Sequence, residues 1–251
     1  MKKLFLSLIL AVTIVLSGCF ELTQEITLNK DGAGTVSNTN DMSAIMGLAR
    51  ELAKKDMEKI ADEVMDTTFT LADRADSIKG LSPEEVIMMK TGHLHIKMNI
   101  QEDKFISTMK FPFTKPGEIA QLNRLSSKLM QETISKQMGE NPAMSSMGET
   151  PELSSFDDYY FMQYSNGLLI KSLNKEKYAM VSNDEYLKGI QEAASMGIPM
   201  STTYVINLPR PVKKAEGKNI KVSDDKKKIT IKVDIDEFFD DPSALEFRIE
   251  Y

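Results

Sequence analysis

Short segments that alternate between apolar and polar residues restrict the fold of this chain more than any other feature. In FELTQEITL, residues 20–28, the apolar residues Phe20, Leu22, Ile26 and Leu28 all occupy even positions. Comparable alternation recurs in segments 93–100, 105–113, 227–235 and 244–251. A strand with one apolar face buries that face and exposes the other to water, which is typical of antiparallel sheets. The pattern therefore predicts antiparallel sheet with one covered face.

Two dipeptides mark tight turns between such strands. Asp31-Gly32 follows the first alternating segment, and Asn166-Gly167 separates DYYFMQY from LLIKSL. Asp-Gly and Asn-Gly favour two-residue hairpin loops, because both residues tolerate the positive φ that these turns require. We therefore predict one hairpin over residues 20–42 and a second over residues 158–173.

Other segments change from a period of two to the helical period. Apolar residues recur at intervals of three or four in 43–66, 116–138 and 183–196, and a shorter helix is predicted to begin at Ser82-Pro83. Such amphipathic helices bury their apolar stripe against another element. The chain is therefore predicted to be an α+β protein, with largely antiparallel sheets built from β-hairpins and amphipathic helices packed on one face.

Residues 140–155 have no periodicity and are rich in Ser, Pro and Gly. Such segments form loops or boundaries between structural units. We predict a mobile loop at this point. The region 19–251 then forms either one α+β domain or two subdomains that the loop divides.

The first twenty residues have the pattern of a bacterial export signal. Lys2 and Lys3 precede the uncharged run Leu4–Leu16, which has the length of a signal peptide and is too short to span a membrane. The run ends in Leu-Ser-Gly-Cys, which resembles the lipobox of bacterial lipoproteins. The resemblance implies that residues 1–18 are a signal peptide, with cleavage between Gly18 and Cys19.

The same resemblance implies a lipid anchor. Cys19, the one cysteine in the chain, would carry a diacylglycerol thioether and an acyl chain such as palmitate on its new amino group. Acyl chains on both sites would suffice for stable attachment to a membrane. The alternatives are an ordinary secretory signal that happens to precede a cysteine, and a thiol buried in the core.

Phe20, which follows the cysteine, bears on localisation. By analogy with enteric lipoproteins, in which Asp at this position retains the protein in the inner membrane, Phe20 implies the outer membrane, facing the periplasm, in a Gram-negative host. In a Gram-positive host the lipobox implies the outer face of the cytoplasmic membrane. Because Phe20 also begins the first predicted strand, we expect the sheet edge that carries this strand to lie against the bilayer.

The residues offer little sign of catalysis, so we expect a protein without enzymatic activity, catalytic residues, metal or cofactor. The sequence contains no Gly-x-Ser-x-Gly, no Walker loop and no His-Glu-x-x-His. His93 and His95 fall on one face of a predicted strand, as a metal site would require. That face continues through Lys97 and Asn99, so we interpret both imidazoles as exposed to water. The net charge of −6 argues against a nucleic-acid partner.

Three acidic pairs are candidate catalytic carboxylates. Asp157-Asp158, Asp224-Asp225 and Asp240-Asp241 each fall at a predicted turn. Asp is favoured in turns because its side chain accepts hydrogen bonds from nearby backbone N–H groups. We therefore expect these residues to shape turns.

Two segments resemble bacterial lipoprotein domains of the LppM type. LPRPVKKAEGKNIKVSDDKKKITIKVDI, residues 208–235, resembles the ending of such domains, in which a strand leads through a proline turn into two short strands. GCFELTQEITLNKDGAGTV, residues 18–36, is similar to the beginning of many lipoproteins of this kind. The resemblance implies an α+β domain able to bind lipid. The long predicted helices at 43–66 and 116–138 depart from that pattern.

Two functions compete. The chain has 17 Met residues and no Trp, and flexible Met side chains recur on adaptable apolar binding surfaces. The first hypothesis is a binding module that holds a lipid or other apolar ligand between sheet and helices. The second is an assembly platform for a protein partner in the cell envelope, for which the 140–155 loop and an exposed apolar patch are the places to examine. An enzyme would need polar residues from distant segments to converge in a cleft.

Overall fold

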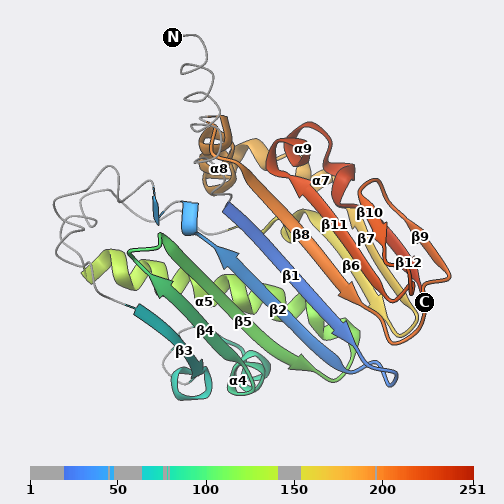
Figure 1. Ribbon diagram of the computed structural model, residues 1–251, viewed down its shortest axis with the longest axis horizontal. Coiled ribbons are helices and arrows are strands. Elements are labelled where there is room, and N and C mark those ends of the chain that lie inside the picture. The colour runs from blue at the N-terminus through green and yellow to red at the C-terminus, as the bar shows by residue number, and fades with distance from the viewer. Residues whose placement is uncertain are drawn as a thin grey trace, which may run out of the picture.

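The computed structural model is dominated by two β-sheets and one long helix (Figure 1). It describes residues 20–44, 46–47, 64–75, 78, 80–140, 154–195 and 197–251, with positions 133–140 described by their backbone alone. Residues 1–19 and 141–153 therefore lie outside the described part. The signal peptide, the cleavage site between Gly18 and Cys19, the lipid anchor and nearly all of the 140–155 loop stay predictions.

The larger sheet has eight described strands in the order β10-β11-β8-β1-β2-β5-β4-β3. Their bounds are β1 Phe20–Leu28, β2 Gly34–Asp41, β3 Val64–Thr70, β4 His93–Asn99, β5 Lys104–Phe113, β8 Met200–Asn207, β10 Ile220–Val222 and β11 Lys228–Asp234. Neighbouring strands are antiparallel except β1 and β8, which pair in parallel at the centre. The first predicted hairpin is confirmed as β1 and β2.

The smaller sheet has four described strands in the order β6-β7-β12-β9. Their bounds are β6 Tyr160–Ser165, β7 Leu168–Leu173, β9 Lys214–Glu216 and β12 Phe247–Glu250. The Asn166-Gly167 turn joins β6 to β7, as the sequence predicts, and Gly167 has the positive φ of 95° that this turn requires. The second predicted hairpin is thus confirmed from β6 onward.

Five α-helices lie in the described residues. They are α4 Pro83–Lys90, α5 Ile119–Glu140, α7 Lys175–Tyr178, α8 Glu185–Ser195 and α9 Ile235–Asp240. The predicted start of α4 is confirmed, because Ser82 accepts a bond from the Glu85 N–H and Glu85 reaches back to the Ser82 N–H. Among the described residues, no helix is both long and apolar enough to cross a membrane.

One face of the large sheet is covered, and both α5 and the small sheet lie against it (Figure 1). Alternation along the strands places Ile26, Val36, Phe111 and Ile229 on this inner face with no solvent exposure. The buried apolar residues of both sheets and of α5 form one core cluster. The predicted α+β class with one covered face is confirmed. The small sheet, rather than a further helix, covers the half of that face near β8 and β11.

Two expectations are wrong. Val64–Asp66 was expected to end a helix, but it begins β3 and pairs with Lys97–Asn99 of β4; of the residues before it, only 43, 44, 46 and 47 are described as helical. The strand that follows the cysteine is not at a sheet edge, because β1 has β8 on one side and β2 on the other. An anchor at Cys19 would therefore bring the starting end of β1, and not an edge of the sheet, toward a bilayer.

Candidate functional site

A cavity of about 140 Å³ lies between the inner face of the large sheet and α5. It is lined by strand residues from β1, β2, β5 and β8, by α5, by residues 154–157 and by Tyr186 of α8. Its volume is close to that of an engineered cavity that holds one benzene molecule. The described cavity therefore accepts a small group and not a whole lipid.

The cavity lies where polar residues interrupt the apolar inner face of the sheet at two neighbouring levels, one with Gln24 and Asn38 and one with Thr202 and Asn40. Tyr204, Gln24, Asn38 and Met109 lie opposite one another across β8, β1, β2 and β5. The neighbouring row, which contains Ile26, is wholly apolar and closely packed. Polar side chains that face each other between two layers leave space and hydrogen-bonding groups where the core would otherwise close.

Helix α5 supplies the opposite wall. Its apolar residues Ile119, Leu122, Leu125 and Leu129 are buried, as the helical spacing predicts. Asn123 and Ser126 are buried on the same helix and face the cavity. Asn38 of β2 donates to Ser126 Oγ at 2.9 Å, which joins the helix to the sheet.

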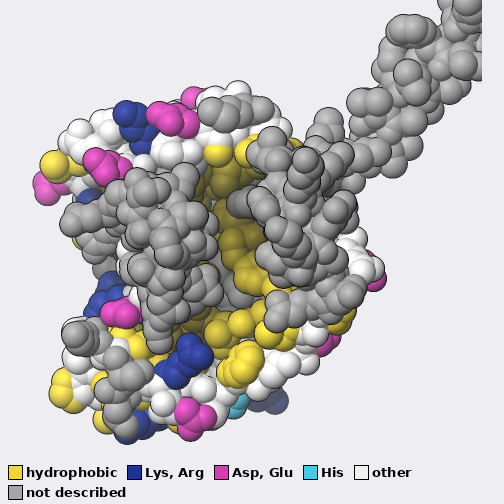
Figure 2. All heavy atoms as spheres, turned by 90° about the vertical axis from the view of Figure 1, so that its left-hand side faces the viewer, with side chains coloured by type: hydrophobic (Ala, Val, Ile, Leu, Met, Phe, Trp, Pro, Cys, Tyr) yellow, Lys and Arg dark blue, Asp and Glu magenta, His cyan; other side chains and the backbone are white. Residues whose placement is uncertain are grey.

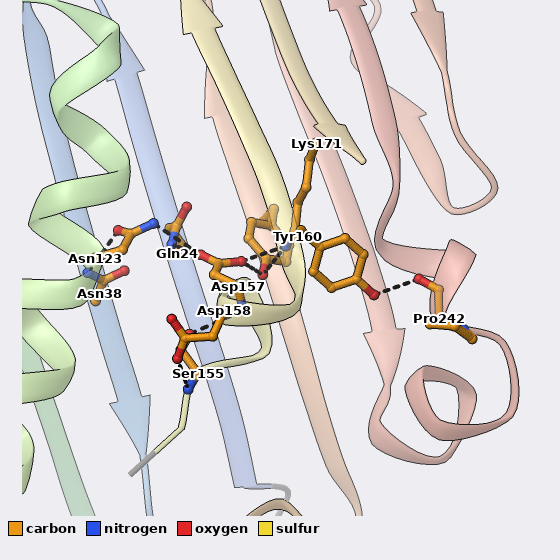
Figure 3. Close-up of polar contacts among 10 residues, drawn as sticks. Gln24, Asn38, Asn123, Ser155, Asp157, Asp158, Tyr160, Lys171 and Pro242 are labelled. Carbon is orange, nitrogen blue, oxygen red and sulfur yellow. Dashed lines mark hydrogen bonds and ion pairs between the residues drawn. The ribbon is translucent and has the colours of Figure 1, made fainter. Parts of the chain in front are cut away.

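Asp157 is the charged residue at the centre of the site (Figure 3). It lies in a short 3-10 helix, Phe156–Tyr159, which Ser155 caps. Asp158 closes the cap by accepting from the Ser155 N–H at 2.9 Å, so Asp158 has the turn role that the sequence predicts. The expectation for Asp157 is wrong, because its side chain points into the interior and is 6% exposed.

Four hydrogen bonds converge on the Asp157 carboxylate. Oδ1 accepts from Lys171 Nζ at 2.5 Å and from the Tyr204 hydroxyl at 2.6 Å. Oδ2 accepts from Asn123 Nδ2 at 3.0 Å and from Gln24 Nε2 at 3.2 Å. A carboxylate offers about four lone-pair positions, so Asp157 has no acceptor capacity left.

Burial and the ion pair act in opposite directions on these groups. Burial raises the pKa of Asp157, but the Lys171 ammonium and the donated hydrogen bonds outweigh it and hold that pKa below the ordinary value. Burial lowers the pKa of Lys171, and the Asp157 carboxylate opposes that shift. Burial, together with the adjacent carboxylate, raises the pKa of Tyr204. Burial thus opposes the charged form of each group, while Asp157 and Lys171, 2.5 Å apart, stabilise each other's charge.

The Lys171 side chain ties the two sheets together. It extends from β7 of the small sheet, its side chain is fully buried, and its Nζ lies 2.6 Å from the hydroxyl of Tyr204 on the large sheet. The ammonium also lies 4.0 Å from the ring centre of Tyr204 and 4.6 Å from that of Tyr160. The Tyr160 hydroxyl in turn donates to the Pro242 carbonyl oxygen at 2.6 Å. The cation is thus satisfied by groups from both layers.

The other sequence-predicted positions lie away from this site. His93 and His95 are on the outer face of β4, as expected, and His95 Nε2 lies 2.7 Å from Asp66 Oδ1 at an exposed position. Asp225 and Asp241 accept hydrogen bonds within their turns, as predicted. Within the described residues, no group of three or more His, Cys, Asp or Glu side chains is arranged to hold a metal ion.

Sequence reasoning missed the members of this network, although a signal was present. Gln24 occupies an even position between Leu22 and Ile26, so it interrupts the apolar face of the first strand. Lys171 lies two residues after Leu169 in LLIKSL, on the face that is buried. When a polar residue falls among the apolar residues of one strand face, either the predicted register of the strand is wrong or the residue is a buried functional or structural group.

Comparisons with known proteins add one structural match. No protein-family model matches the chain, and no curated protein matches it. Among solved structures, the folded domain of LppM from Mycobacterium tuberculosis, determined by NMR, matches with a TM-score of 0.39 and 10% sequence identity. The match covers 92% of this chain and 90% of that chain. LppM is also the type of lipoprotein domain that residues 18–36 and 208–235 resemble.

Proposed function

We propose that this chain is a membrane-anchored lipoprotein of the cell envelope, without enzymatic activity, whose domain binds one end of an amphiphilic molecule in the cavity between the large sheet and α5. The observation that supports this proposal is the cavity itself. It has a polar base beside the wholly apolar row that contains Ile26, and its volume of about 140 Å³ suits a head group rather than a complete lipid.

The inner face next to the cavity suits an apolar tail. The row that contains Gln24 and Asn38 continues through Met109 on β5 and Leu94 on β4 to Phe69 on β3, which is 40% exposed. Three strand spacings separate Asn38 from Phe69, about 14 Å. Figure 2 shows this side of the molecule, where hydrophobic side chains line a hollow. A ligand with its head at the polar base would direct its tail along this row.

The position of the predicted anchor is consistent with a membrane-derived ligand. Leu22 lines the cavity, and it follows Cys19 by three residues, or about 10 Å of extended chain. A domain anchored at Cys19 would hold the cavity close to the bilayer surface. We propose the outer membrane, facing the periplasm, for a Gram-negative host.

The absence of enzymatic activity is proposed from the chemistry of the ion pair. Among the described residues that line the cavity, Asp157 carries the only charge, and its four acceptor positions are occupied. Lys171 is fully buried, so it does not reach a bound molecule. A general base needs a free lone pair, and a nucleophilic amine needs access to the substrate.

The platform alternative has less support. The exposed large hydrophobic residues of the described part are Val64, Phe69, Ile87, Phe161, Met180 and Val222. They belong to five separate parts of the fold, and single exposed apolar residues are normal on soluble surfaces. These six residues therefore do not together form one apolar patch for a protein partner.

Native mass spectrometry tests the binding proposal. The full-length protein, released from membranes in nanodiscs, should carry a molecule of defined mass in addition to its covalent lipid. Met130→Trp, which fills the cavity from α5, should remove that molecule. Ile87→Trp, at a position that is 67% exposed on α4, is the matched control and should retain it. Wild-type protein with no bound molecule, or equal loading of both variants, would contradict the proposal.

A further inference from the structure

The hydrogen bonds of the cavity base have a consistent direction that restricts what the cavity can bind. Because the Asp157 carboxylate only accepts, it fixes the amide groups of Gln24 and Asn123 with their N–H groups toward it. Asn38 then donates to Ser126 and, over a longer distance of 3.5 Å, to the carbonyl oxygen of Asn123. Gln24 and Asn123 thus each direct an N–H group toward Asp157, and Asn38 directs its N–H groups toward α5.

This direction leaves acceptors without donors. The Gln24 carbonyl oxygen is buried and has no hydrogen-bond partner among the described residues. Asn38 lines the same cavity and uses its two N–H groups in the bonds to Ser126 and Asn123, so its carbonyl oxygen is the part of the amide left to accept. The donors on α5 are used locally, since the Ser126 hydroxyl donates to the Leu122 carbonyl oxygen and the Ser127 hydroxyl to that of Asn123. A buried acceptor without a donor is costly, and a ligand that donates removes that cost.

The charges restrict the ligand further. The described residues that line the cavity include no Lys, Arg or His. A phosphate would therefore find no cation among the described lining residues to balance its charge. An ammonium group could donate, but the one nearby carboxylate, Asp157, is already neutralised by Lys171 at 2.5 Å. Neither ion would find a counter-charge, and an unpaired buried charge is strongly unfavourable.

We propose that the cavity recognises an uncharged group that donates a hydrogen bond, a hydroxyl of a polyol, through the carbonyl oxygens of Gln24 and Asn38. This inference rests on the proposed function, because it names the chemical class that the same cavity binds. A hydroxyl also accepts, so it pairs equally with hydroxyl groups of the lining such as that of Tyr186. The polyol is either the head of an amphiphile or a free molecule.

Calorimetric titration with three short amphiphiles that share one tail tests the head-group preference. Full-length protein in nanodiscs is titrated with 1-O-hexylglycerol, hexyl phosphate and hexylammonium, with empty nanodiscs as the blank. The hexylglycerol should bind at least about tenfold more tightly than either ion, since each ion leaves buried groups unpaired. Free glycerol distinguishes the two sources of the polyol. Binding equal to that of hexylglycerol would support a free polyol and contradict an amphiphile.

The outcomes separate this inference from the proposed function. If hexyl phosphate or hexylammonium binds as tightly as hexylglycerol, the head-group inference is wrong while a binding module remains. If none of the three binds, the proposed function itself is wrong. The ranking is measured on the wild-type protein, so it decides the question even if a variant does not fold.

A pair of matched variants then tests the residue assignment. Gln24→Met keeps the length of the side chain and removes the buried carbonyl oxygen, so it should weaken hexylglycerol binding about tenfold and leave hexyl phosphate unchanged. Gln163→Met makes the same change at an exposed position of β6 and should alter neither affinity. Equal hexylglycerol binding by both variants would overturn the role given to Gln24.

Discussion

Replacing Lys171 by Met tests the buried ion pair most directly. The change keeps most of the apolar stem and removes the ammonium group that lies 2.5 Å from Asp157 Oδ1. Because the two side chains are 0% and 6% exposed, water cannot reach the carboxylate to replace the lost charge. Removing one partner of a buried ion pair costs about 3–5 kcal/mol of unfolding free energy. For a chain of this size, that corresponds to a fall in Tm of about 6–20 °C.

Lys214→Met provides the control, because it makes the same change at an exposed ion pair. Lys214 and Glu216 lie 2.8 Å apart, but each side chain is more than half exposed. Exposed pairs contribute from almost nothing to about 1 kcal/mol. Urea unfolding of the full-length proteins, followed by far-ultraviolet circular dichroism because the chain has no Trp, gives the two free energies.

The double variant Asp157→Asn/Lys171→Met supplies the sharper comparison. It leaves no buried charge without a partner, so it should be more stable than Lys171→Met alone by at least about 1 kcal/mol. Two results would refute the reasoning. One is a Lys171→Met protein as stable as Lys214→Met. The other is a double variant whose loss equals the sum of the two single losses, which would mean that the charges do not interact.

Three further predictions concern acid stability, two glycines and the predicted anchor. The pKa of Asp157 in the folded protein is held below that of an unfolded Asp, about 3.9, so the unfolded state takes up the proton first as the pH falls. The wild type should therefore lose stability below about pH 4. Acid titration should show a smaller loss for the uncharged double variant. Gly34→Ala should destabilise the protein by about 1–3 kcal/mol in urea unfolding, since the new Cβ would lie 1.9 Å from the Thr27 carbonyl oxygen. Gly189→Ala in α8 is the contrasting case, because its Cβ would meet no atom within 4 Å, and it should stabilise the protein by about 0.5–1 kcal/mol. Cys19→Ser should abolish metabolic labelling with palmitate and release the protein from membranes; retention of the label would contradict the predicted anchor.

The sequence predicts the elements that obey a single local period. The strands β1, β4, β5 and β11 and the helix α5 have regular apolar spacing, and the structure confirms them within a few residues. The same spacing does not predict which strand each of these strands pairs with. Nothing in FELTQEITL indicates that it pairs in parallel with Met200–Asn207, because a period of two does not distinguish one neighbour from another.

The site was harder to predict than the fold for a related physical reason. Turn propensity correctly describes the backbone around Asp157, which lies in a capped 3-10 turn, but it does not say whether the side chain faces water. That outcome depends on Lys171 and Tyr204, which reach Asp157 only after the two sheets pack together. A buried charge is stable only with partners, and those partners come from segments that no local pattern connects.

The parallel pairing of β1 with β8 is expected to form later than the β1–β2 hairpin when the chain folds. The strand β1 can form its hairpin with the adjacent β2 early. Its other edge pairs with β8, which is far away in the sequence: Thr203 of β8 and Glu21 of β1 are 182 residues apart. Contacts of such long range close slowly because the intervening chain must first be confined. If the chain is exported and anchored at Cys19 as predicted, β1 would present an open edge of unpaired N–H and C=O groups near the membrane until the last fifth of the chain arrives.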